Sequence, residues 1–458
     1  MNDYLNHLYP LIPVVHRPSF CQDLASNRDT NDTDFLGLII ALCATVVAAL
    51  PSKFKEYRLS RTPIRFETRE EMINCCHAML LNLRGPHYFD EINFRKFAAS
   101  YLMTIAFLQL GEYNRARMME VEMMQLGRLL HIHKISEYEG LNCIETQLRK
   151  KGFWLIFYTQ VHEQLQNLRK ERLMYFDEAL LNSVDLEELL PLEVDDEFIF
   201  EDRVLNPSQT TCLTTGFIIH SRVFWTALKS PKSRDVSTPM EQYCQCVRST
   251  HPDAQINYLK ARLQDLKYML DSVPIQLRQW APPDSNTETK DKEIYSSHFR
   301  TMRANLHVTH LWLQSIIIDQ IETLEQQQQH CHRSPTDQHH QNPHLYPSLT
   351  WWSTREEICR QLLHVLHNIP MANLEPNGLH LTHKIRDVAV GLLTCPFEAH
   401  EPASIRAAEY VTEFTEILSR LDTSEKVNTT SLQSWVDTDR VKGSGKGRRD
   451  IWNSNWDR

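Results

Sequence analysis

Apolar side chains recur along this chain at the spacing of one helical face rather than in strict alternation. Residues 115–132 show the clearest stripe, formed by Met119, Met123, Leu126 and Leu130. Residues 143–168 continue the pattern with Phe153, Trp154, Phe157, Val161, Leu165 and Leu168. Spacings near i, i+4, i+7 and i+11 predict amphipathic helices, each with one face packed on a core.

The same reading predicts helices over most of the chain, at 69–83, 94–110, 208–228, 255–272, 295–325, 352–368 and 400–421. Residues 35–50 differ because all 16 of them are apolar or small, and Pro51 closes the run. A bilayer needs about 20 apolar residues. We therefore expect a buried core helix here and no membrane contact.

Composition favours an all-α fold, because only 12 of the 458 residues are glycine. Sandwiches, barrels and nucleotide-binding loops use glycine more freely than helices do. We predict a large irregular helical bundle with a core at 1–230, a continuing helical region at 231–325 and C-terminal helices at 350–422. Polar composition predicts a Gln/His-rich linker at 326–349 and a disordered tail at 423–458.

Charge and cysteine usage narrow the function classes. The net charge of -9 argues against a chain that grips nucleic acid by itself, since phosphate neutralisation requires a basic face. The 11 cysteines include no C-x-x-C pair, so we expect reduced thiols and no zinc cluster built from them.

Histidine-rich stretches are the candidates for a metal site. The tract 330–344 carries competent ligands without the fixed spacing of a zinc site: His330, Cys331, His332, His339, His340 and His344. The pairs in "HVLH" (364–367) and "HLTH" (380–383) lack a fixed third ligand and general base, although Glu356 and Glu357 are near in sequence. A metal-dependent hydrolase stays an alternative, and we expect no enzyme.

Acidic and apolar residues alternate in "DLEELLPLEVDDEFIFED" at 185–202. This alternation is typical of activation segments, and it also fits a helix end and structured loop at the edge of a core. We favour the structured loop. Whether the stretch activates transcription stays open.

The opening stretch "YLNHLYPLIPVVHRPSF" resembles the start of the regulatory middle region of fungal binuclear zinc cluster transcription factors. Tyr9 stands where that family usually has His, and the matching positions are Tyr4, Pro10, Pro13, Val14, Val15, His16, Arg17, Pro18 and Phe20. Proline disfavours helix geometry in the residue before it, so we expect a kinked, extended path. Its apolar side chains should lie on the bundle rather than form an exposed P-x-x-P ligand.

Further stretches resemble the same family in the same order. Residues 101–134 resemble a helical pair that ends in Leu-Gly-Leu-His, with His131 at the family's glycine and His133 at its histidine. "ETQLRKKGFWLIFY" matches at Glu145, Arg149, Lys150, Lys151, Phe153 and Trp154, and "LLPLEVDD" matches at Leu190, Pro191, Asp195 and Asp196. Gln160 replaces a common Asp, and the usual Gly-Arg-Pro is missing after residue 168, which weakens any ligand role for that loop.

The resemblance implies a transcription regulator in the nucleus. Residues 1–230 would be its regulatory core, controlling a metabolic or secondary-metabolite gene set as activator or repressor. It implies no cofactor in this chain, because zinc and DNA binding belong to an N-terminal cluster that the sequence does not contain. Expected partners are DNA through such a module or a partner, the transcription machinery or another zinc cluster factor, and a small-molecule effector. A helical interaction protein that modulates a full-length zinc cluster factor is the alternative.

Overall fold

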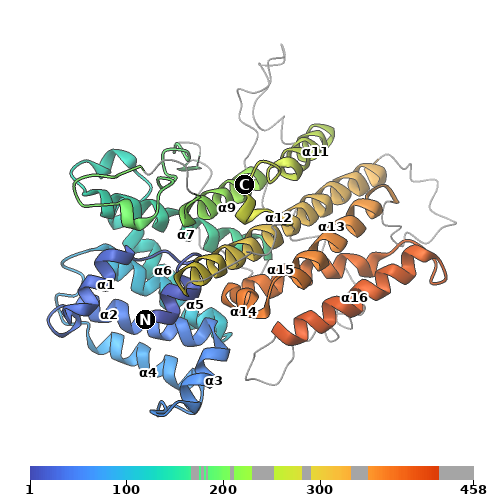
Figure 1. Ribbon diagram of the computed structural model, residues 1–458. Coiled ribbons are helices and arrows are strands. Elements are labelled where there is room, and N and C mark those ends of the chain that lie inside the picture. Colours follow the sequence, from blue (N-terminus) through green and yellow to red (C-terminus); the bar gives the residue numbers. More distant parts are fainter. Residues whose placement is uncertain are drawn as a thin grey trace. The chain divides into compact units, whose positions relative to one another are not determined.

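The computed structural model describes residues 1–166, 175–176, 180–181, 184–206, 211–228, 252–280, 290–331 and 349–421 (Figure 1). The α-helices are α1 (Arg17–Ala25), α2 (Thr33–Ala49), α3 (Pro51–Leu59), α4 (Arg69–Asn82), α5 (Phe94–Gln109), α6 (Tyr113–Leu129), α7 (Cys143–Gln166), α9 (Leu213–Leu228), α11 (Pro252–Tyr268), α12 (Lys290–Cys331), α13 (Leu349–Asn368), α14 (Met371–Leu374), α15 (Gly378–Val390) and α16 (Pro402–Leu421). Within these ranges no strand forms, and Ile199 and Val204 make one isolated bridge. The predicted all-α bundle is confirmed.

The chain divides into two compact units. Unit 1 comprises residues 1–221, 274–306 and 369–381, and unit 2 comprises 222–273, 307–368 and 382–458. The domain boundaries drawn from the sequence stay predictions. The Gln/His tract after residue 331 and the tail after residue 421 lie outside the described residues.

Helix α2 is the central helix of unit 1, and α4 and α5 pack against it. It begins where the Asp32 carboxylate accepts hydrogen bonds from the backbone N–H groups of Asp34 and Phe35. Most of its side chains are buried, which confirms the predicted core helix. Among the described residues no single helix is long and apolar enough to cross a bilayer; α2 and α3 pass that test only together, and they meet at 102°.

The end of α6 carries an unusual backbone. The N–H of Ile132 donates to the carbonyl of Gly127 at 3.1 Å, and the N–H of His131 donates to that of Arg128 at 3.0 Å. This is the Schellman arrangement, which needs a left-handed residue just past the helix. His131 supplies it with φ of 51°. The position is the one where the resemblance expects glycine.

The opening segment is buried but not extended. Its apolar side chains lie in the core of unit 1, as predicted, and those of Pro10 and Pro13 are buried with them. The extended path is wrong at both ends, because Tyr4–Leu8 forms a π-helical turn and α1 begins at Arg17. Pro18 fits the first turn of α1, where no backbone donor is needed.

Unit 2 is built from α11, α13 and α16 with the later parts of α9, α12 and α15. Trp312, Leu362 and Phe414 are fully or almost fully buried in it. The guanidinium of Arg355 on α13 bonds the carboxylates of Asp319 and Glu322 on α12 at 2.6 and 2.7 Å. The predicted helix at 295–325 is therefore part of a longer one, while the sequence reading missed α3 and α15.

Candidate functional site

Three of the four segments quoted for the family resemblance, the opening stretch, residues 145–158 and residues 189–196, meet at Asp196, whose side chain is 1% exposed. One carboxylate oxygen accepts from Lys151 Nζ of α7 at 2.8 Å. The other accepts from the Tyr9 hydroxyl at 2.5 Å and from the backbone N–H of Arg17 at 2.9 Å. We call Tyr9, His16, Arg17, Lys151 and Asp196 the Asp196 junction.

His16 completes the junction through the backbone. Its Nε2 lies 2.8 Å from the carbonyl oxygen of Asp196 and its Nδ1 lies 2.8 Å from the Ser19 hydroxyl oxygen. A carbonyl oxygen only accepts, so Nε2 carries the proton. Nδ1 then accepts from the Ser19 hydroxyl and from the Ser19 backbone N–H, and caps α1. One imidazole thus caps the start of α1 and binds residues 185–202, which we call the acidic loop.

Asp195 connects the same loop to two other helices. One of its oxygens accepts from the backbone N–H of Leu213 at the start of α9, at 2.9 Å. The other accepts from the hydroxyl of Tyr295 on α12 at 3.0 Å. Adjacent acidic residues therefore face different partners and hold helices that are far apart in sequence.

Burial and charge act in opposite directions on the Asp196 carboxyl. Burial raises its pKa, but the Lys151 charge, with the hydrogen bonds from Lys151, Tyr9 and Arg17, outweighs burial and lowers the pKa to about 2. Burial, reinforced by the Asp196 charge, raises the pKa of Tyr9 well above 10. At neutral pH the junction holds a carboxylate, an ammonium and a phenol that donates.

Aromatic residues of α7 pack near the acidic loop, and one of them is hydrogen-bonded to it. Trp154 is 1% exposed, and its indole N–H donates to the carbonyl of Leu189 at 3.1 Å. Phe153 is fully buried, with its ring 5.0 Å from that of Phe176. Pro191 is buried in the loop itself.

The remaining predicted positions take no part in the hydrogen bonds of the junction. The Tyr4 hydroxyl donates to the carbonyl of Ile12 at 2.7 Å, and the Phe20 ring packs edge-on against Tyr4. His133 Nδ1 is hydrogen-bonded to the Tyr175 hydroxyl at 3.1 Å. Pro18 is exposed at the start of α1. The structure therefore brings His16 and Asp196 together and packs the Tyr4 ring edge-on against Tyr9, whereas His133 and Phe20 lie outside the junction.

Sequence reasoning missed three of the groups that complete the site. Lys151 stands inside a quoted motif and Tyr9 inside the opening stretch, and the signal was their place in those stretches. Tyr295 carries no local signal, because it lies 100 residues from its partner Asp195.

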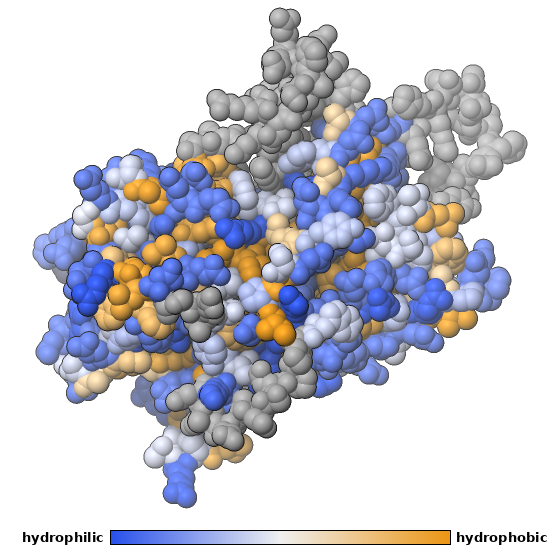
Figure 2. Space-filling view, turned by 45° about the horizontal axis from the view of Figure 1, so that its top comes forward, coloured by the Kyte–Doolittle hydropathy of each residue, from blue (hydrophilic) through white to orange (hydrophobic). Residues whose placement is uncertain are grey.

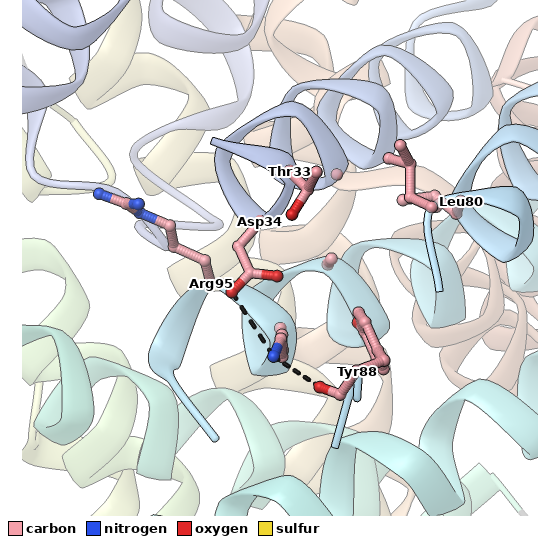
Figure 3. Close-up of a pocket in the computed structure, with 9 residues that line it drawn as sticks. Thr33, Asp34, Leu80, Tyr88 and Arg95 are labelled. Atoms are coloured by element: carbon pink, nitrogen blue, oxygen red, sulfur yellow. Dashed lines mark hydrogen bonds and ion pairs between the residues drawn. The ribbon is translucent and has the colours of Figure 1, made fainter. Parts of the chain in front are cut away.

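Two small hollows lie in unit 1. The first, at the start of α2, has about 300 Å³ of non-atom space including open solvent, and its Asp34 and Lys96 are 3.5 Å apart (Figure 3). Lys96 Nζ also donates to the carbonyls of Tyr88 and Glu91, so its charge is already engaged. The second has about 310 Å³ of space, again including open solvent. It is lined by Pro10, Leu11, Tyr158, Gly216, Phe217, His220, Met302 and Asn305.

The comparison with known families supplies an identity for this arrangement. The family described as "Fungal specific transcription factor domain" matches residues 1–244, which include every segment of the Asp196 junction. The chain belongs to this family. No curated protein and no solved structure matches it.

The fungal-specific transcription factor domain is a domain of transcription regulators and not of enzymes, and membership implies a regulatory role in transcription. Two of the histidines considered for a hydrolase site have other partners in the structure. His367 Nε2 lies 3.0 Å from a Glu413 oxygen, and His364 is hydrogen-bonded to Asn368. In the described part of the chain no group of three or more His, Cys, Asp or Glu is placed to hold a metal ion; most of the tract 330–344 lies outside that part.

Proposed function

We propose that this chain is the regulatory domain of a nuclear transcription factor that controls a metabolic or secondary-metabolite gene set. The observation that carries the proposal is the family match over residues 1–244, in which the opening stretch and α7 meet at Asp196. DNA contact would come from a zinc cluster in a separate module or from a partner protein, because the net charge of -9 disfavours contact by this chain alone.

The Asp196 junction is the element that we assign to regulation. Asp196 of the acidic loop is hydrogen-bonded to Tyr9 of the opening segment and paired with Lys151 of α7. A displacement of any one of these segments should therefore shift the other two. A regulatory domain needs two states of different ligand affinity. A small effector could act through the second hollow, because Pro10 and Leu11 of the opening segment line it and the flexible Met302 side chain can yield there.

A fusion of the whole chain to an unrelated DNA-binding domain, placed over a reporter gene in a fungal host, tests the proposal. We expect reporter output to change at least tenfold against the DNA-binding domain alone, and Lys151→Met to alter that output. Lys150→Met is the matched control, since Lys150 Nζ donates to the Leu190 carbonyl at 3.3 Å and, within the described residues, makes no hydrogen bond to Asp196.

Unchanged output at equal nuclear protein level would contradict the proposal. If the fusion is silent but the free chain alters the output of a full-length zinc cluster factor, the chain is instead an interaction protein that modulates that factor. Both readings use the same strains, so the experiment separates them.

A further inference from the structure

Residues 197–205, which we call the acidic hairpin, form a short antiparallel turn beside the junction. Ile199 and Val204 are bridged. The N–H of Phe200 donates to the carbonyl of Arg203, and that of Leu205 donates to the carbonyl of Phe198, both at 2.9 Å. Successive side chains of such a pair point to opposite faces.

The alternation separates a buried face from an outward face. Ile199 is 3% exposed and points into unit 1, whereas Phe200 is 40% and Leu205 is 47% exposed. The guanidinium of Arg203 lies 5.6 Å from the centre of the Phe200 ring, as their opposite positions in the turn require. The hairpin thus presents an aromatic and an aliphatic side chain outward.

The hairpin is fixed to the first turns of α7. The N–H of Cys143 donates to the carbonyl of Glu201 at 2.9 Å. One turn further, the Gln147 side-chain oxygen accepts from the backbone N–H of Leu192 at 2.7 Å, and Leu192 is 45% exposed. Leu192 therefore flanks the hairpin, and Leu192, Phe200 and Leu205 form what we call the apolar patch.

The stretch that carries the apolar patch is rich in acidic residues, although Glu197 is paired with Arg17 at 2.6 Å. Residues 185–206 contain nine acidic residues and one basic residue, Arg203. The exposed acidic residues, which we call the acidic rim, are Asp185, Glu187, Glu188, Glu193, Glu197, Glu201 and Asp202. Figure 2 shows one face of the molecule, on which hydrophilic residues cover most of the surface and apolar residues gather in several groups between them.

We propose that the apolar patch and its acidic rim bind a basic amphipathic segment of a partner protein. The Phe200 ring would be the buried anchor, and the acidic rim would steer and orient the basic side chains. Nucleic acid is repelled by the same charge. A second copy is disfavoured, because a symmetric contact would bring two acidic rims together. This inference goes beyond the proposed function, which assigns no surface for a partner protein.

The test uses the full chain and a fluorescent 18-residue helical peptide of leucine and lysine as the probe. Binding is measured by fluorescence anisotropy at 0.15 M salt. We expect Phe200→Ser/Leu205→Ser to weaken binding at least tenfold. Leu59→Ser/Phe89→Ser is the matched control, because Leu59 is 87% and Phe89 is 56% exposed elsewhere in unit 1; we expect it to stay within twofold of wild type.

A peptide with glutamate in place of lysine should bind at least tenfold more weakly to wild type. Glu201→Lys/Asp202→Lys should narrow that preference. Equal binding of the lysine peptide to wild type and to Phe200→Ser/Leu205→Ser, at unchanged circular dichroism, would overturn the proposal. A dimer in sedimentation velocity that Phe200→Ser dissociates would also overturn it, by assigning the patch to a second copy.

Discussion

Asp196 in unit 1 and Lys384 in unit 2 are both almost completely buried, and their polar groups are satisfied in opposite ways. Asp196 in unit 1 faces an ammonium, a phenol and a backbone N–H. Lys384 in unit 2 donates to the Thr309 hydroxyl at 2.7 Å and lies 5.3 to 5.4 Å from the ring centres of Phe224 and Trp312. Both side chains are 1% exposed, so the surroundings and not the depth make the difference.

The surroundings of Lys384 hold little compensating charge. Burial lowers the pKa of the neighbouring His383 to about 3 and that of His310 to about 4, so both imidazoles are neutral at pH 7. One oxygen of the Asp387 carboxylate accepts from the Trp312 indole N–H. In the described residues Lys384 forms no ion pair, and burial lowers its pKa to about 7. Burial therefore favours the neutral amine in unit 2, while the junction favours the charged carboxylate in unit 1.

The largest expected effect comes from breaking the ion pair of unit 1. Lys151→Met leaves the Asp196 carboxylate buried without its cation, which typically costs about 3–5 kcal/mol. Urea unfolding at pH 7 measures the loss. The double variant Lys151→Met/Asp196→Asn should be less destabilised than the sum of the single ones, because no charge is left uncompensated. Simple additivity would show that the pair is not coupled as the geometry requires.

Removing the buried amine of Lys384 in unit 2 should stabilise the fold, whereas removing the amine of Lys151 in unit 1 should destabilise it. The depressed pKa of Lys384 means that folding loses stability as pH falls from about 10.5 to about 7, by up to about 5 kcal/mol. Lys384→Met removes this penalty and loses one hydrogen bond, so we expect a net gain of about 3 kcal/mol at pH 7.

The gain of Lys384→Met should shrink as pH rises from about 7 through 10.5, because above that range the amine is neutral in both the folded and the unfolded state. Lys96→Met is the matched control, since Lys96 is also buried but donates to two carbonyls at 2.6 Å and pairs with Asp34. That variant should lose stability at pH 7. A gain in both variants, or in neither, would remove the contrast between the two units.

A smaller effect should appear in acid. The pKa of Asp196 is lowered from 3.8 to about 2, so its contribution is complete above pH 4 and is lost as pH falls through 2. The stability difference between wild type and Asp196→Asn should therefore shrink by about 2 kcal/mol from pH 5 to pH 2. Guanidinium unfolding at each pH measures it. A difference that stays constant would place the charged carboxylate outside the junction.

Helices with a clear apolar stripe could be predicted from the sequence, and α5 and α6 begin and end within three residues of the predicted bounds. Helices α3 and α15 were missed because their short runs carry many polar residues, and packing in the folded chain decides their conformation. The path of residues 4–20 was mispredicted for a related reason. The His16 cap and its contact with Asp196 favour a helix that proline rules alone do not predict.

The site was predictable only as far as the motifs reach. The order of the motif segments indicated that residues 4–20 and 185–202 belong to one arrangement, but no local pattern tells which oxygen of Asp196 faces Lys151. Tyr295 reaches Asp195 through the tertiary fold alone. Long-range partners of a buried charge need the folded chain to be identified.

The smallest expected effect concerns backbone conformation in unit 1 and no buried charge. His131 has φ of 51° at the end of α6, where a side chain with a Cβ is strained and glycine is not. His131→Gly should therefore stabilise the fold by about 1 kcal/mol. His131→Ala is the matched control, because it removes the imidazole but keeps the Cβ, and we expect no gain from it. Thermal unfolding measures both variants. Equal changes in stability would trace the effect to loss of the imidazole, and would contradict backbone strain at His131.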